Sequence, residues 1–222
     1  RYFRRLSESR LIVSNVETQN IKFDSDTTAF TIASDGTVSG TGDNATMVLL
    51  RKVTASSVSS IEFIHGSNGV VLDSTYSRYE IHIDTCVGAN AQYLRVYGSS
   101  NGGSSYFGDS AYNTILHRSY TNGSSTATDT NYHNDSLATT QSTVPFASNK
   151  GGVDGKIVVT NLGTAHRTLF NTEFSYFDTS SYYVNVNCLG AVESNGDAFN
   201  AIKIAMTSGN IASGTFKLYG IK

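Results

Sequence analysis

The stretch "SGNIASGTFKLYGIK", residues 208–222, decides the fold. Its Ser-Gly-Asn and Ser-Gly pieces predict turns at residues 208–210 and 213–214, because glycine and asparagine tolerate the backbone conformations that turns require. After the second turn, apolar and polar side chains alternate, which is typical of a strand with one face in the core and the other in water. We therefore expect Phe216 and Leu218 to lie in a hydrophobic core.

The same alternation recurs along most of the chain. Runs of period two, bounded by Gly, Asn, Ser or Asp, lie at residues 61–65, 79–84, 93–97, 156–159, 168–177, 182–188 and 201–206. About eight to ten such runs, with few helical patterns between them, predict antiparallel strands with one wet face. We therefore expect an all-β fold, an antiparallel β-sandwich of jelly-roll-like form.

Composition and charge narrow the class of protein. The chain has 222 residues, of which 11% are aromatic, and this argues against disorder. Its formal net charge of -2 argues against a nucleic-acid partner, which would require a basic face. No run approaches the ~18 apolar residues of a membrane span, so we expect no membrane insertion.

The N-terminal segment differs from the rest of the chain. Residues 20–50 contain alternating pieces of about three to five residues, which bury little apolar area and are marginal in isolation. Such a segment needs a partner surface, either the main domain or other subunits. We therefore divide the chain into an N-terminal stem or neck, residues 1–52, and a sandwich domain, residues 53–222. The segment Arg4–Val13 fits either one short helix or the start of a strand.

The two cysteines, Cys86 and Cys188, both lie at the end of apolar strand patterns. A small disulfide-stabilised secreted domain would carry more cysteines than this chain does. The pattern favours two buried thiols, with a single disulfide as the alternative.

Five blocks carry a family resemblance: "SSVSSIEFIHG", "STYSRYEIHID", "AQYLRVYGSSNGGSSY", "GKIVVTN" and above all "IASGTFKLYGIK". Together they resemble a β-sandwich domain of tail-associated and fibre proteins of bacteriophages. The resemblance covers roughly residues 53–222. It implies a structural module of the virion, at the end of a trimeric fibre or spike, with other tail proteins as partners. It implies no shared set of catalytic residues.

The stem lies outside this resemblance. In a fibre, three chains side by side would cover the short strands that a single chain leaves half exposed, because exposed strand edges favour pairing. We therefore expect a homotrimer located in the virion, assembled in the cytoplasm of a bacterial host.

The sequence contains no recognisable catalytic or metal-binding motif. No Gly-x-Ser-x-Gly elbow precedes a helix, and the histidines lack the spacing of metal ligands. We therefore expect no catalytic residues, no metal and no cofactor. Asp129, His133 and Asp135 cluster in one segment and form a minor candidate for a cation site.

Aromatic residues in and beside two irregular stretches, residues 98–113 and 120–152, are the better indication of a binding site. The candidate ligand-binding residues are Tyr106, Tyr112, Tyr120, Tyr132 and His133. Tyrosine offers a rigid apolar face and a polar tip, which suits the ring faces and hydroxyls of a sugar. The alternative is that these rings pack beneath their own loops.

Three functions compete at this point. The first is a tail-fibre or spike component that attaches to a host-surface molecule, a glycan or a protein, without being an enzyme. The second is a virion adaptor or decoration domain that makes protein–protein contacts alone. The third is a glycan-processing enzyme, which would need an acidic pair or a metal site in a cleft.

Overall fold

The structure of the chain is a computed structural model. It describes residues 20–22, 28–32, 38–40, 47–108, 111–133, 136, 138–140, 151–164, 166–192 and 198–222. Every element of regular secondary structure in these residues is a β-strand, which confirms the all-β class. The chain divides into two compact units, residues 1–46 and 47–222.

The first unit contains three short strands. They are β1 (Asn20–Lys22), β2 (Thr28–Ile32) and β3 (Val38–Gly40), paired in that order in an antiparallel sheet. Short strands were expected here, but the predicted boundary after residue 52 falls inside β4 (Met47–Val58), which belongs to the second unit. The segment Arg4–Val13 lies outside the described residues.

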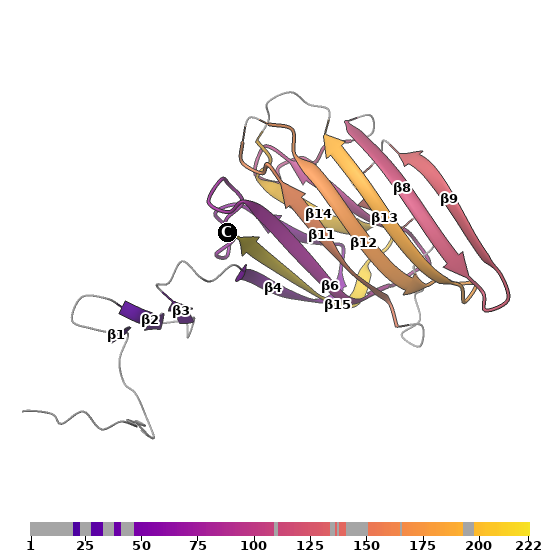
Figure 1. The fold of residues 1–222 in the computed structure, drawn as a ribbon, viewed down its shortest axis with the longest axis horizontal. Coiled ribbons are helices and arrows are strands. Elements are labelled where there is room, and N and C mark those ends of the chain that lie inside the picture. The colour runs from indigo at the N-terminus through magenta and orange to yellow at the C-terminus, as the bar shows by residue number, and fades with distance from the viewer. Residues whose placement is uncertain are drawn as a thin grey trace, which may run out of the picture. The chain divides into compact units, whose positions relative to one another are not determined.

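The second unit is built from two antiparallel sheets (Figure 1). The eight-stranded sheet has the order β4 (Met47–Val58), β15 (Ile211–Ile221), β6 (Arg78–Gly88), β11 (Val153–Thr160), β12 (Leu169–Phe177), β13 (Tyr183–Val192), β8 (Tyr112–Thr121) and β9 (Thr126–His133). The four-stranded sheet has the order β10 (Ala138–Thr139), β7 (Leu94–Ser99), β14 (Ala201–Met206) and β5 (Ser60–Ile64). Figure 1 looks onto the larger sheet, with β14 behind it.

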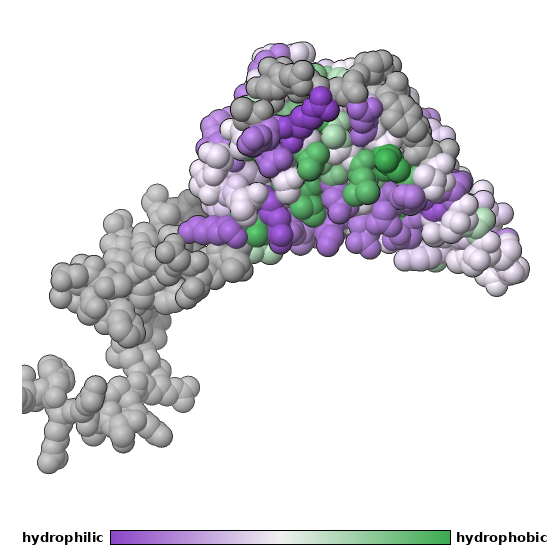
Figure 2. Space-filling model, turned by 45° about the horizontal axis from the view of Figure 1, so that its top comes forward, coloured by the Kyte–Doolittle hydropathy of each residue, from purple (hydrophilic) through white to green (hydrophobic). Residues whose placement is uncertain are grey.

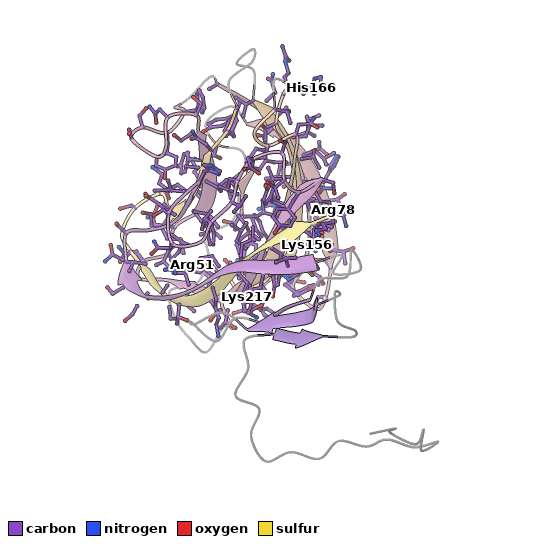
Figure 3. All side chains as sticks on the ribbon, turned by 90° about the vertical axis from the view of Figure 1, so that its left-hand side faces the viewer. Arg51, Arg78, Lys156, His166 and Lys217 are labelled. Atoms are coloured by element: carbon purple, nitrogen blue, oxygen red, sulfur yellow. The ribbon has the colours of Figure 1, made fainter. Side chains whose placement is uncertain are left out.

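One core lies between the two sheets. Phe174 and Val186 from the larger sheet and Phe63 and Ile204 from the smaller one are completely buried in the same cluster. Figure 3, seen from the side on which β4 lies, shows side chains filling the space between the layers. Buried and exposed residues alternate along β12 and β13, so each of these strands has one face in the core and one outside. These features confirm the antiparallel β-sandwich.

Strand β15 lies between β4 and β6 and pairs with both along its length. Phe216 and Leu218 are 0% exposed, as the alternation predicted, while Lys217 points outward and donates to Asp84 Oδ2 at 2.7 Å. The turn predicted at residues 213–214 is wrong. Ser213 and Gly214 lie inside β15, at an irregularity in its pairing with β6.

Gly214 has a physical reason to be glycine. Its φ angle is 144°, and a Cβ at this position would lie 2.9 Å from the Cα of Cys86. A Ser-Gly pair suits either a turn or a bulge, and here the strand continues on both sides, so the bulge forms.

Cys86 and Cys188 are free and buried, which confirms the prediction of two buried thiols. Burial disfavours the thiolate and raises the pKa of Cys86 to about 12. The same cause raises the pKa of Cys188. Both thiols are therefore poor targets for labelling reagents while the sandwich is folded.

Phe216→Ala should lower the free energy of unfolding by about 3–5 kcal/mol, because it removes a fully buried ring and leaves a cavity. Denaturant titration followed by circular dichroism measures the change. Lys217→Ala, which alters the next residue on the outer face, is the matched control and should have little effect. Equal stability of the two variants would contradict the placement of β15.

Deleting residues 215–222 should give aggregated protein, because β4 and β6 would each expose an unpaired edge where β15 now lies. Size-exclusion chromatography of the soluble fraction measures this. Deletion of residues 1–9 is the control and should leave the sandwich folded. A soluble, cooperatively folding product of the first deletion would show that β15 is dispensable.

Candidate functional site

The five residues predicted to bind a ligand do not form one site. Tyr112 begins β8 and Tyr120 lies near its end, so about 27 Å of extended strand separates them. Tyr106 precedes β8, in the segment after β7. Each residue is therefore placed separately below.

Tyr112 belongs to the core, and its prediction as a ligand-binding residue is wrong. It is 1% exposed. Its hydroxyl donates to the carbonyl of Phe107 at 2.9 Å and accepts from the N–H of Gly98 at 3.2 Å. Burial raises its pKa, so the phenol stays neutral. The hydroxyl holds the segment after β7 against β8.

Tyr106 contacts a cation of its own chain. The Lys203 ammonium lies 4.2 Å from the ring centre of Tyr106 and 4.9 Å from that of Tyr97. Burial and the nearby carboxylate of Glu62 raise the pKa of Tyr106. A ring with a cation–π contact inside its own molecule offers less surface to an external ligand.

Tyr132 and His133 end β9, paired in register with Ile115 and Thr114. Their side chains lie outside the described residues, so their role in binding stays a prediction. The proposed cation site is weakened by Asp129, whose carboxylate pairs with the guanidinium of Arg118; the Arg118 Nε to Asp129 Oδ1 distance is 3.1 Å.

Tyr120 is half-buried at the end of the sandwich where β8 meets the β12–β13 hairpin. Its ring stacks on Tyr182, with centroids 5.8 Å apart and planes inclined by 7°. The Arg118 guanidinium lies 4.7 Å from the centre of the same ring. Tyr120 and Tyr182 therefore form a half-buried stacked pair beside the turn between β12 and β13.

Tyr183, the residue after Tyr182, points to the opposite face of the sheet, because the side chains of successive strand residues alternate between the two faces. There it meets Phe177, its register partner on β12. The two rings are T-shaped, with centroids 5.5 Å apart. Phe177 is 45% exposed and Tyr183 is 44% exposed. We call this pair of exposed rings the aromatic platform.

A tight turn positions the platform. Asp178 follows Phe177, and its Oδ1 accepts from the N–H groups of Ser180 and Tyr182, each at 2.9 Å. Such a carboxylate–backbone arrangement closes a hairpin and fixes where the strands on either side begin. Phe177 and Tyr183 are thus the last and first residues of paired strands.

The side chains nearest the platform on β8, β9 and β13 are polar and uncharged, while Ser175 on β12 also borders the charged residues Asp154 and Glu173. Thr121 is the register partner of Tyr183, and Thr126 pairs with Thr121. In the next row, the side-chain amide of Asn185 donates to Ser175 Oγ at 3.1 Å. Hydroxyl and amide groups next to exposed rings form a surface suited to a neutral ligand rich in hydroxyls.

A polar hollow of about 400 Å³ lies further along the same face, lined by residues that include His82, Asp84, Asp154, Lys156 and Glu173. Two of its carboxylates are engaged: Asp84 accepts from Lys217, and Asp154 Oδ1 accepts from the N–H of Thr85 at 2.8 Å. Within the described residues, no group of His, Cys, Asp and Glu has the arrangement of a metal site. The described residues contain no helix with the length and apolar character needed to cross a membrane.

Sequence reasoning missed Phe177 and Tyr183 because it searched the irregular loops. Both residues lie in segments predicted as strands. A usable signal was present, since "FDTSSYY" (residues 177–183) places aromatic residues of exposed parity on either side of a short Asp-Ser turn.

Comparison with known proteins gave no match: no family model, curated protein or solved structure matches the chain. The geometry described above and the resemblance of the sequence blocks are therefore what support a function for this chain.

Asp178→Ala should lower the free energy of unfolding by about 0.5–2 kcal/mol, the range found when a side chain that caps backbone N–H groups is removed. The rings of the platform should also lose their fixed geometry. Denaturant titration measures the stability. Asp178→Asn retains an acceptor and is the control. If both variants matched the parent protein, the turn would not depend on this carboxylate.

Proposed function

We propose that the chain is a structural protein of a bacteriophage virion, a tail-fibre or spike component, that attaches to a host-surface glycan through the aromatic platform. The five sequence blocks support the virion setting. The exposed pair of Phe177 and Tyr183, among uncharged hydroxyl and amide groups, is the observation that carries the attachment proposal.

The chemistry of the platform fits a sugar. A pyranose ring has a face of C–H bonds that packs on an aromatic ring, and its edge carries hydroxyls that need hydrogen-bonding partners. Phe177 and Tyr183 supply the apolar contact. Thr121, Asn185 and Ser175 supply hydroxyl and amide groups in adjacent register positions.

A trimer would make a weak site effective. Linking several binding sites can raise the overall affinity by about 10²–10⁴ without new contacts. The short strands β1, β2 and β3 of the first unit support the proposed trimeric stem, because strands this short are marginal without a partner. Attachment through several shallow platforms then needs no deep pocket.

Catalysis has less support. A glycan-processing enzyme needs a carboxylic acid and a carboxylate facing a substrate cleft. The polar hollow has carboxylates, but Asp84 is paired with Lys217 and Asp154 holds a backbone N–H. These contacts favour a structural role for both groups.

The double variant Phe177→Ala/Tyr183→Ala should weaken binding to its glycan by about 10–100-fold, since each exposed ring contact contributes roughly 0.5–1.5 kcal/mol. The measurement uses the full chain on an array of purified bacterial surface polysaccharides, and then the affinity for the polysaccharide that binds. Tyr93→Ala removes a ring that is 36% exposed outside the eight-stranded sheet, and it should bind as the parent does.

Two results would contradict the proposal in different ways. If the parent protein bound neither polysaccharides nor bacterial cells, the adaptor function would replace attachment. If it bound and the double variant bound equally well, attachment would stand and the platform would not be the site.

A further inference from the structure

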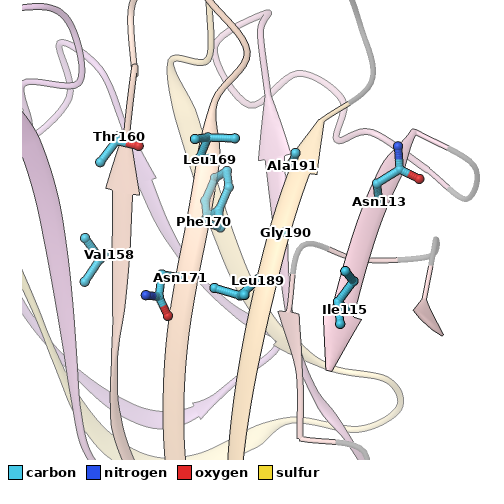
Figure 4. A pocket seen from close by; sticks show the side chains of 10 residues that line it. All are labelled: Asn113, Ile115, Val158, Thr160, Leu169, Phe170, Asn171, Leu189, Gly190 and Ala191. Atoms are coloured by element: carbon cyan, nitrogen blue, oxygen red, sulfur yellow. The ribbon is translucent and has the colours of Figure 1, made fainter. Parts of the chain in front are cut away.

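A second surface on the outer face of the eight-stranded sheet is apolar and hollow (Figure 4). It lies over β8, β11, β12 and β13 and encloses about 640 Å³. Its lining includes the exposed aliphatic side chains of Ile115, Leu169 and Leu189 and the half-buried Val158, with Asn113 and Asn171 among them. We call it the aliphatic hollow.

Exposed apolar side chains are concentrated on this face. Of the eight large hydrophobic residues that are exposed in the described part of the chain, seven belong to strands of the eight-stranded sheet, and Tyr93 does not. The seven are Met47, Leu49, Ile115, Leu169, Phe177, Tyr183 and Leu189. Figure 2 shows hydrophobic groups gathered in the middle of the visible face and bordered by hydrophilic ones. Patches of this kind mark interaction surfaces.

One row of register partners crosses this face of the sheet. It runs through Leu49, Tyr219, Glu80, Val158, Asn171, Leu189 and Ile115, so aliphatic residues occupy four of its seven positions and Tyr219, Glu80 and Asn171 lie between them. From β4 to β8 the row crosses six strand spacings, which is roughly 29 Å. A standard protein interface covers ~800 Å² on each partner, about 28 Å on a side. The row therefore has the width of one protein interface.

The lining favours a protein over a sugar. The exposed lining side chains, Ile115, Leu169 and Leu189, are aliphatic, and the one ring, Phe170, is 2% exposed. Sugar recognition through apolar contact depends on exposed rings, whereas aliphatic side chains pack well against the apolar side chains of another protein. On this basis the hollow is a protein-docking surface.

The charges of the face are balanced. The outward register positions of β4, β15, β6, β11 and β12 carry four cationic and four anionic residues: Lys52, Lys217, Arg78 and Lys156, and Glu80, Asp84, Asp154 and Glu173. Arg78, Lys156 and Lys217 are labelled in Figure 3. Several already pair within the face, such as Arg78 with Glu80 at 3.3 Å. Two copies of such a face meet without net repulsion, and each can offer both signs to the other.

We infer that the aliphatic hollow is covered by a second copy of this chain, with outer face packed on outer face. The width of the row, its aliphatic lining and its balanced charge all fit the same surface on a neighbouring copy. This inference depends neither on the proposed trimer nor on the attachment to a glycan, because a contact between the same face of two copies pairs only two chains. Along β13, about 20 Å separates Leu189 from Tyr183, so the aromatic platform stays available to another ligand.

The test compares self-association of the full chain with that of Leu189→Lys, measured by analytical ultracentrifugation. A charge placed in a buried apolar contact should raise the dissociation constant at least about tenfold. Tyr93→Lys changes an exposed ring outside this sheet, and it should associate as the parent does. A parent protein that stays monomeric, or a Leu189→Lys variant that associates like the parent, would overturn the inference.

A second measurement, the rate of thiol labelling, does not require a charged residue in the sheet. Leu189→Cys, Tyr93→Cys and Phe177→Cys each add one thiol, and the native thiols are 0% exposed. In the single chain residue 189 is 50% exposed and residue 93 is 36% exposed, so an uncovered residue 189 would react faster with a maleimide. In the associated protein we expect the reverse order: the thiol of Leu189→Cys should react with the maleimide about tenfold more slowly than that of Tyr93→Cys. The thiol of Phe177→Cys should react without protection by the second copy. Faster reaction at 189 than at 93 would overturn the inference, whatever the glycan array shows.

Discussion

The pairing of β15 with both β4 and β6 is the interaction on which the sandwich depends. Strand β4 lies at the edge of the eight-stranded order, so its neighbour β15 is what joins it to the rest of the sheet. Side chains alternate along each strand, so a slip of one residue would turn Phe216 and Leu218 outward and bring Lys217 into the core. The burial of those two side chains therefore fixes the register of the strands beside them.

That register also assembles the outer face. Once β15 and β6 are aligned, pairing through β11, β12 and β13 carries the same parity across to β8. Leu49 and Ile115, at opposite ends of the row, are then on one surface although the chain between them passes through both sheets. The aromatic platform and the aliphatic hollow are two regions of this single surface, at different levels of the same strands.

Period-two alternation is local, which is why the strands and the burial of Phe216 could be predicted from sequence. The order of strands is not local, and no pattern in "SYYVNV" indicates that Tyr183 has Phe177 on one side and Thr121 on the other. Tyr112 was misjudged for a related reason. Its hydroxyl finds its partners, Phe107 and Gly98, only after the segment following β7 has folded back. The sequence favoured aromatic residues as candidate ligand contacts, but it did not indicate the face on which the exposed rings meet.

The polar residues at other outward positions of the same strands indicate that the apolar residues of the outer face are not needed for folding. On β8, β12 and β13 the outward positions near the platform are Ser119, Ser175 and Asn185, and these strands pair there without difficulty. A few residues along the same strands, the outward positions are Ile115, Leu169 and Leu189. Threonine has a strand propensity comparable to that of such residues. Threonine at these three positions would therefore have kept the sheet soluble at little cost in stability. Because the core lies on the other face, half-exposed leucines gain little from the fold alone, which is why we propose that a second copy of the chain buries them.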